Sequence, residues 1–214
     1  VGIGNLDTKA FITGATIDKN SGDASDIDVT ALNQTDLISA SGSAALSTAK
    51  TDNKPSAGIA GAVAYSFMDN DTQAWLDGVT DGHAGDVTVQ ALSGGSIVDL
   101  GLGLAYNKNS DQKSGSVAGS FSIGTASNST TADIRNSTLT AADDTAQVNV
   151  TSYDHTDIGA GGGAFAIGGS KGVGIGVTYT DIGNTNTAGV HGSTLDGFGD
   201  TSVQSLNAAR IASA

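Results

Sequence analysis

A pattern of apolar residues recurs four times along this chain of 214 residues. Its clearest copy is the segment DVTVQAL, which begins at Asp86, and related segments begin at Asp26, Gln147 and Thr201. The valines at equivalent places are 60, 61 and 53 residues apart, and they are Val29, Val89, Val150 and Val203. Periods of this length are typical of solenoids and other arrays of stacked units. The repeat, of about 57 residues, therefore constrains the fold more than any other feature.

Two further apolar positions keep the same order in every copy. The first lies five residues after the end of the segment: Leu32 is followed by Leu37, Leu92 by Ile97, Tyr153 by Ile158, and Leu206 by Ile211. The second is an alanine followed two residues later by an aliphatic residue: Ala10 and Ile12, Ala74 and Leu76, Ala132 and Ile134, Ala188 and Val190. A spacing of two places both members of a pair on one face of a β-strand. The repeat is thus predicted to consist of strands.

The segments GIAGAVAYSF (58–67) and GVGIGVTY (172–179) alternate between bulky and small residues. In both, one strand face carries mainly Ile, Val, Tyr or Phe, and the other carries mainly Gly and Ala. A face of Gly and Ala permits the close approach of another backbone or sheet. No segment sustains the apolar spacing of an amphipathic helix. The sequence therefore predicts an all-β fold.

A single repeat has too little apolar surface to form a core, whereas stacked repeats merge their inward apolar side chains into continuous stripes. We therefore predict one continuous β-solenoid whose repeats are 1–57, which starts within a repeat, 58–114, 115–170 and 171–214, which is partial. Because Gly, Asn, Asp and Ser interrupt the apolar runs, short strands are expected, with two or three coils per repeat. Roughly eight to eleven coils would then form about 40–55 Å of rod. The polar stretches 48–57, 107–114 and 168–171 are expected to project as loops.

The composition excludes several kinds of partner. The formal net charge is −13 and the nine Lys and Arg residues are scattered singly, so no nucleic-acid partner is expected. The absence of cysteine excludes a disulfide scaffold and a Cys-ligated zinc site. No run approaches eighteen apolar residues, so we expect no helix that spans a membrane. Because Val1 lies within a repeat, with neither initiator Met nor signal peptide, we expect the chain to be a piece of a longer protein.

No catalytic or metal-binding residues are predicted. The acids nearest to one another are expected to be turn residues at strand ends, and they are Asp23, Asp26 and Asp28, and Asp69 and Asp71. The three histidines occupy unrelated places in their repeats, and they are His83, His155 and His191. The stretches DNDT (69–72) and DGFGD (196–200) match neither the twelve-residue calcium loop nor the glycine-rich calcium repeat. We therefore expect a noncatalytic protein with no cofactor.

Five Asn-x-Ser/Thr sequences offer acceptors for N-glycosylation, at Asn33, Asn70, Asn128, Asn136 and Asn149. Such sequences arise by chance in a chain rich in Asn and Thr. We interpret these asparagines as unmodified polar residues of turns and strands.

Phe11 and Trp75 are the candidate surface-contact residues. They lie between the Ala and aliphatic residues of equivalent pairs, and the other two repeats have Asp133 and Gly189 there. Such chemical variety fits an outer surface better than a core. Two stacked aromatic rings could form a platform for a sugar or a partner protein, although exposed aromatic pairs also commonly pack beneath a loop. We favour the packing interpretation.

The succession GIAGAVAYSFMDNDTQAWLDG and GDVTVQALSGGSIVDLGLGLAYN (58–78 and 85–107) resembles the repeats of filamentous-haemagglutinin-like giant exoproteins. These are adhesins exported by two-partner secretion or as autotransporter passengers, and the resemblance covers essentially the whole chain. It implies a right-handed parallel β-helix at a Gram-negative cell surface, acting as a stalk or adhesive shaft.

The leading functional hypothesis is a noncatalytic rod segment of a secreted or cell-surface adhesin, which extends and stiffens the support of a binding tip. Its partners would be neighbouring repeats of the same longer chain and a host or bacterial surface glycan or protein. The alternative is an extracellular filament or matrix protein that self-associates through its Gly and Ala faces. A β-helix enzyme that processes polysaccharides is a third alternative.

Overall fold

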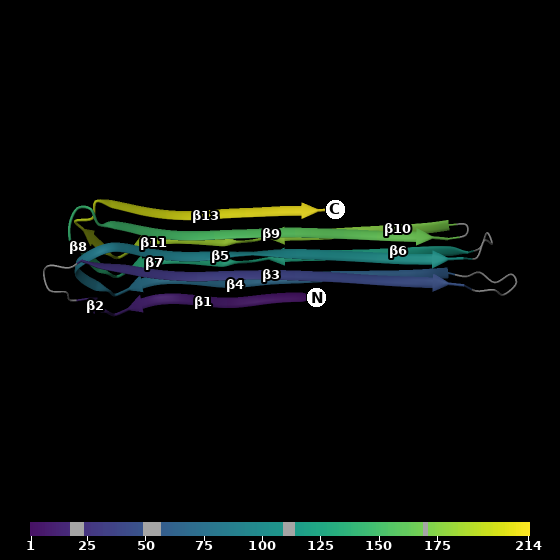
Figure 1. Ribbon diagram of the computed structural model, residues 1–214, viewed down its shortest axis with the longest axis horizontal. Coiled ribbons are helices and arrows are strands. Elements are labelled where there is room, and N and C mark those ends of the chain that lie inside the picture. Colours follow the sequence, from purple (N-terminus) through teal and green to yellow (C-terminus); the bar gives the residue numbers. More distant parts are fainter. Residues whose placement is uncertain (18–23, 49–56, 109–113, 169–170) are drawn as a thin grey trace.

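The computed structural model describes residues 1–17, 24–48, 57–108, 114–168 and 171–214, and these residues form an all-β fold. The chain runs back and forth along one long direction (Figure 1). The strands are β1 (Gly2–Thr13), β2 (Thr16–Ile17), β3 (Ser25–Ser47), β4 (Ala57–Asp77), β5 (Thr80–Asn107), β6 (Gly115–Ala126), β7 (Ser129–Arg135), β8 (Thr138–Ala141), β9 (Gln147–Ile167), β10 (Lys171–Ile182), β11 (Thr185–His191), β12 (Thr194–Asp196) and β13 (Asp200–Ser213).

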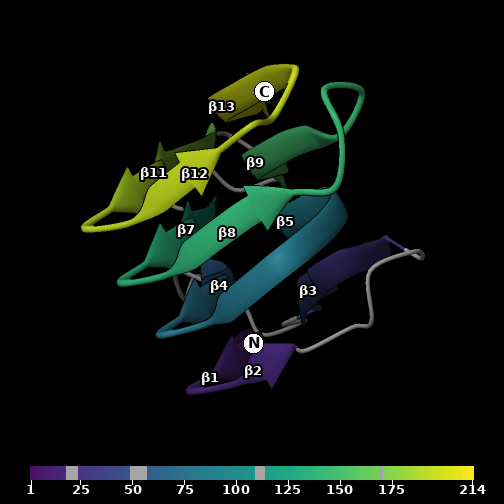
Figure 2. The same cartoon turned by 90° about the vertical axis from the view of Figure 1, so that its left-hand side faces the viewer.

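The strands form two sheets, and all of the strand pairs in the described residues are parallel. Sheet A contains β1, β4, β6, β7, β10 and β11, and sheet B contains β2, β3, β5, β8, β9, β12 and β13. The chain alternates between the sheets, and each pass through both of them forms one layer. The layers are β1–β3, β4–β5, β6–β9 and β10–β13, and Figure 2 shows them one above another where the chain turns from sheet A into sheet B.

The register of the sheets confirms the alignment of the repeated segments. Val89 pairs with Val29 on one side and with Val150 on the other, and Val150 pairs with Val203. The pairs of Ala and aliphatic residues align across the layers of sheet A in the same way. Equivalent residues therefore lie directly above one another, which brings their side chains into continuous inner stripes.

The prediction of two or three coils per repeat is wrong. Residues about 60 apart are direct neighbours in a sheet, so each repeat forms one layer, and the described residues contain four layers instead of eight to eleven. Layers spaced about 4.8 Å apart give a stack roughly 19 Å high rather than 40–55 Å. The strand β5, with 28 residues, extends over about 90 Å, so the long dimension runs along the strands. Many of the Gly, Asn and Ser residues expected in turns lie within strands instead.

Turns from sheet A into sheet B use a residue of left-handed backbone conformation in every layer. These residues are Gly14, Gly78, Asn136 and Gly192, with φ between 48° and 65°. The amide of Gly14 donates to the carbonyl of Asp77 at 2.8 Å, and the amide of Gly78 donates to the carbonyl of Arg135 at 3.0 Å. The turn that follows the Ala and aliphatic pair of each layer is therefore stacked like the strands. Gly or Asn at this turn tolerates the positive φ.

The interior changes character along the strands. Near the stacked turns it contains bulky side chains, among them Leu76, Val89, Ile134 and Val150, which are fully buried. A second, smaller apolar cluster forms around Met68. Farther along, the two sheets are filled by small residues such as Ala60, Ala105 and Ala118. We call the first region the wide half and the last the thin half.

At several positions the thin half is too narrow for any side chain, even that of alanine. A Cβ atom placed on Gly103 of β5 would lie 2.5 Å from the carbonyl oxygen of Gly119 in β6. A Cβ atom on Gly174 of β10 would also clash with a backbone carbonyl, that of Ala164. The expectation that the Gly and Ala faces permit close approach is therefore confirmed, because these faces are the ones that face each other inside.

A buried polar seam separates the bulky core from the cluster around Met68. The side-chain oxygen of Asn128 accepts from the amide of Asn70 at 3.2 Å, and that of Asn184 accepts from the amide of Asn128 at 3.0 Å. From the opposite sheet, Asp154 and Thr156 accept from the Asn128 side-chain amide at 3.3 Å and 2.9 Å. The seam thus supplies hydrogen bonds where β6 and β10 end before β7 and β11 begin, and this satisfies groups that burial would otherwise penalise.

The expected projecting loops 48–57, 107–114 and 168–171 lie largely outside the described residues, and so does Asp23. Asp26 and Asp86 lie near the beginning of the main sheet B segments, where a carboxylate of each caps an amide in the next layer. Asp26 accepts from the amide of Asp86 at 3.0 Å, and Asp86 accepts from the amide of Gln147 at 2.9 Å. Asp69 and Asp71 were expected at a strand end, but they lie inside β4 because this strand continues to Asp77.

Candidate functional site

Phe11 and Trp75 are neighbours in the register of sheet A, and their rings stack on each other. The ring centroids are 4.7 Å apart and the planes differ by 7°, so each ring covers one face of the other. Phe11 is 57% exposed, whereas Trp75 is half-buried beside Asp133 of the next layer. Phe11 is therefore the more exposed ring of the pair.

Charged and polar side chains surround this aromatic pair on the outer face of sheet A. Arg135 donates to Asp133 at 2.6 Å, and His191 of the fourth layer lies 3.7 Å from the same carboxylate. Lys9 lies 2.9 Å from Asp7, and the pKa of Lys9 is raised by this hydrogen bond. The arrangement provides an aromatic face with hydrogen-bond donors and acceptors beside it, which is the chemistry of a surface contact.

The residues weighed for catalysis and metal binding do not come together. No group of three or more His, Asp or Glu side chains in the described part of the chain is placed to hold a metal ion. His155 lies 3.3 Å from Asp157 on sheet B, and His191 lies on sheet A. The stretches 69–72 and 196–200 lie in or near different strands, β4 and the pair β12 and β13.

Three of the five potential glycosylation sites are inside the protein. Asn33, Asn70 and Asn128 are 3% or less exposed. Asn136 is exposed, and its side chain donates to Asp77 at 2.9 Å in the stacked turn. Asn149 is partly exposed on β9. Burial makes the first three unsuitable as acceptors in the folded protein, which agrees with their interpretation as structural residues.

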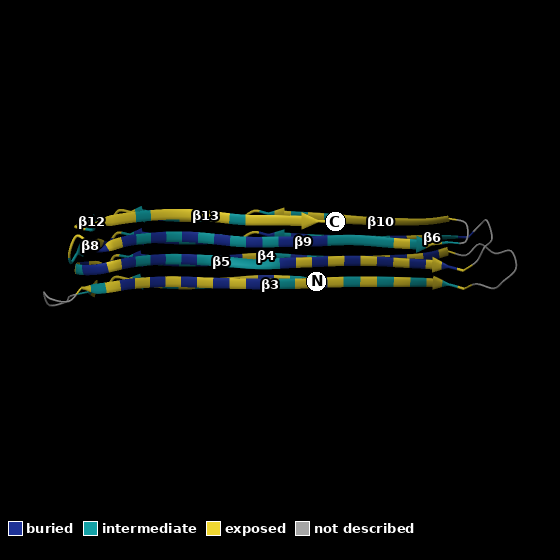
Figure 3. Cartoon of the chain, turned by 45° about the horizontal axis from the view of Figure 1, so that its top comes forward, coloured by how far each residue is buried: buried dark blue, intermediate teal, exposed yellow. Residues whose placement is uncertain are grey.

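Both outer faces of the thin half are apolar, and sequence reasoning did not identify them as a surface. On sheet B the exposed apolar residues include Leu46, Leu100, Leu102, Leu104, Tyr106, Phe165 and Ile167, which we call the leucine face. On sheet A they include Ile59, Val63, Val117, Phe121, Val173 and Ile175, which we call the valine face. The colours of Figure 3 alternate between buried and exposed along the strands. The alternation was visible in the sequence, but it does not tell which face points outward.

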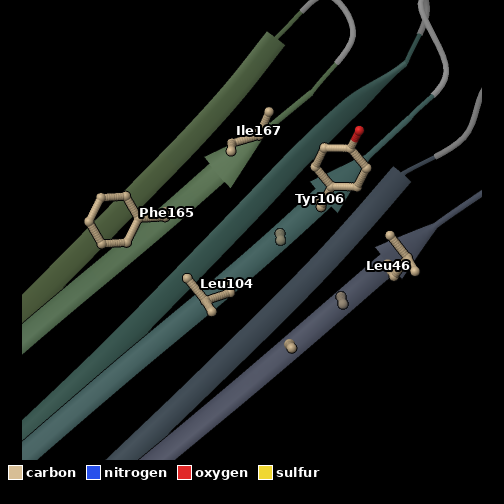
Figure 4. A pocket seen from close by; sticks show the side chains of 8 residues that line it. Leu46, Leu104, Tyr106, Phe165 and Ile167 are labelled. Carbon is tan, nitrogen blue, oxygen red and sulfur yellow. The ribbon is translucent and has the colours of Figure 1, made fainter.

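The leucine face contains a shallow apolar depression. Leu104 and Tyr106 of β5, Leu46 of β3, and Phe165 and Ile167 of β9 surround it, as Figure 4 shows. Its volume is about 360 Å³. Alanines of β3 and β5 complete the lining. A depression with this lining suits an apolar side chain rather than a charged ligand.

Asp99 is the buried carboxylate of the thin half. Its Oδ1 accepts from the hydroxyl of Ser66 at 2.6 Å, and its Oδ2 has no hydrogen-bond partner among the described residues. Burial raises the pKa of Asp99 above 3.8, and the hydrogen bond from Ser66 opposes part of this shift. The folded protein therefore binds this proton more tightly than the unfolded chain does.

We expect Asp99→Asn to increase the free energy of unfolding at pH 7 by roughly 1 kcal/mol, because a buried charge is removed while the Ser66 hydrogen bond is kept. A carboxyl whose pKa is raised by folding makes its full contribution to the free energy of unfolding at pH values below its pKa in the unfolded chain. This contribution is lost as the pH rises through the folded-state pKa. Urea denaturation from pH 3 to pH 7 should show parent and variant converging at the acid end. A difference that stays constant over this range would contradict the assignment.

No protein-family model, curated protein or solved structure matches this chain. The part of the chain that the structure describes also has no helix that is both long and apolar enough to cross a membrane.

Proposed function

We propose that this chain is a noncatalytic segment of a longer rod that extends and stiffens the support of a binding tip, and that its four repeats form a right-handed parallel β-helix. The observation that carries the proposal is the register: the same residues pair from layer to layer across both sheets. A stack of this kind grows by adding repeats and needs no ligand to close its core. Right-handedness follows the strong preference of crossover connections between parallel strands.

The proposed setting is a large secreted or cell-surface adhesin of a Gram-negative bacterium. The support is the resemblance of 58–78 and 85–107 to the repeats of filamentous-haemagglutinin-like exoproteins. These residues form most of β4 and β5, the two strands of layer 2. Phe11 and Trp75 are the proposed contact residues for a surface glycan or protein, because their rings stack and the ring of Phe11 is exposed.

A structural filament or matrix protein is the second candidate function. The Gly and Ala faces support such association poorly, because residues such as Ala60, Ala64 and Ala118 are buried between the two sheets. Lateral association would use the leucine face or the valine face instead. The size of these apolar surfaces favours this second candidate over a polysaccharide-processing enzyme.

The rod proposal can be tested with a tandem chain made of residues 1–214, then 162–178, then 1–214 again. At the end of the first copy, Ser213 pairs with Ala160, so the missing strand continues from residue 162. At the start of the second copy, Gly2 occupies the place of Thr180, because Gly2 pairs with Ser66, Ser66 with Gly124, and Gly124 with Thr180. The linker 162–178 therefore joins the two copies in register. We expect eight layers, a stack of about 38 Å and an unchanged length along the strands. Small-angle X-ray scattering and thermal unfolding would measure this, with a melting temperature above that of the single chain.

A linker shortened by one residue, 162–177, is the matched control. It shifts the second copy by one position, which turns every inward side chain of the joining strand outward. Scattering from two separate units, together with an unchanged melting temperature in the in-register tandem, would contradict the proposal.

A further inference from the structure

The apolar surface of this protein is separated from its charge. On the sheet B side of the thin half, segments 38–47, 98–107 and 158–167 contain a single charged residue, Asp99, whose side chain is fully buried. The leucine face itself carries no charge, although the chain as a whole has a formal charge of −13. Exposed apolar patches of this kind mark interaction surfaces on soluble proteins. The leucine face is therefore a surface that water solvates poorly.

The relief of the leucine face is self-complementary. Leu100, Leu102 and Leu104 form a ridge in the middle layer. The residues beside this ridge in the register are small at most positions: Ala40, Gly42 and Ala44 in β3, and Gly161 and Gly163 in β9, with Phe165 as the exception. The ridge thus runs between two lower rows, one of which leads into the depression of about 360 Å³. A second copy turned by 180° about an axis that lies in the plane of the face, parallel to the strands, can place its ridge in such a row.

We propose that the leucine face binds the leucine face of a second copy of this chain, and that the pair has two-fold symmetry. A face of ten residues by three layers measures about 33 Å by 14 Å, so the two copies together cover roughly 900 Å² before side-chain relief is counted. The relief of the side chains raises the buried area toward about 1,200 Å², which is the lower end of the range for specific protein interfaces. Such a pair closes on itself, since the same patch is used on both partners.

A lipid bilayer fits the face less well than a second copy does. The formal net charge of −13 disfavours contact with anionic lipid. The rows of small residues beside the leucine ridge give the face a relief that a second copy can fill, whereas fluid hydrocarbon chains gain nothing from that relief.

Sedimentation velocity of the 214-residue chain over the micromolar range tests the proposal. We expect the parent to form a dimer and Leu102→Asp to weaken its association at least about tenfold, because one charge is buried in each half of the interface. Val63→Asp is the matched control, since Val63 is 60% exposed on the valine face and Leu102 is 53% exposed. It should leave the dimer unchanged, and circular dichroism should show the same strand content in all three chains.

Three outcomes would overturn the proposal. A parent chain that stays monomeric at all concentrations would do so, and its flotation with phosphatidylcholine vesicles would identify lipid as the occupant. Association that survives both Leu102→Asp and Val63→Asp would assign the contact to the sheet edges instead. Association that Val63→Asp abolishes while Leu102→Asp does not would assign it to the valine face.

Discussion

Replacing Gly103 with valine is expected to lower the free energy of unfolding by about 3 kcal/mol or more. The new Cβ atom would lie 2.5 Å from the carbonyl oxygen of Gly119 and 3.2 Å from its carbonyl carbon. Those atoms belong to the backbone of β6, so no side chain can move aside to relieve the clash. The two sheets would have to separate, which would open the contacts of the thin half. Urea denaturation followed by circular dichroism measures the effect.

Gly61→Val is the matched control for this experiment. Gly61 is also a strand glycine, in β4, but nothing lies within 4 Å of a Cβ atom placed there. Valine at this position should be neutral or stabilising by roughly 0.5–1 kcal/mol, because it replaces a glycine within a strand. If the two substitutions destabilised the protein equally, strand propensity rather than sheet separation would account for the loss at Gly103.

The replacement of Asn128 with alanine is expected to cost about 2–4 kcal/mol. Asn128 is 2% exposed, and its side chain makes hydrogen bonds in two directions. It accepts from the amide of Asn70 at 3.2 Å and donates to Thr156 at 2.9 Å and to Asp154 at 3.3 Å. Its removal leaves a backbone amide without its side-chain acceptor and a buried carboxylate with one donor fewer, and both losses are costly away from water.

Asn5→Ala provides the comparison for Asn128→Ala. Asn5 lies in β1 of the first layer and is exposed, so its replacement should change the free energy of unfolding by no more than about 0.5 kcal/mol. Thermal and urea unfolding of the two variants would measure the difference. Equal stability of both variants would show that the seam contributes no more than a solvated surface does.

The alignment of the repeats could be predicted from the sequence because it depends on local spacing. Three features recur with fixed spacing: the valines, the apolar residues five positions after each valine segment, and the Ala and aliphatic pairs. Stacked strands must place equivalent residues side by side. The register pairs Leu32 with Leu92, Leu92 with Tyr153, and Tyr153 with Leu206, as the sequence alignment requires. The position of Phe11 beside Trp75 followed from the same spacing.

The number of layers could not be predicted, because Gly, Asn, Ser and Asp act as turn signals in an isolated sequence. In this protein many of them lie within long strands. Asn70 and Asn128 face a polar seam in which their side chains are satisfied, and Gly103 fits where the sheets approach most closely. Those partners come from the next layer or from the opposing sheet: Asn128 is 58 residues from Asn70, and Thr156 is 28 residues from Asn128. A local stretch of sequence does not show them.

The sequence by itself determined the strand content, the repeat and which residues share a strand face, since these follow from periods of two and of about 57 residues. Only the tertiary structure decided which face is inside. Bulky residues such as Leu102 and Val63 point outward in the thin half, whereas bulky residues such as Leu76 and Val89 point inward in the wide half. The reason is the distance between the sheets: where glycine meets backbone there is no room for a larger side chain, so the alternating strand must turn its bulky face to the surface.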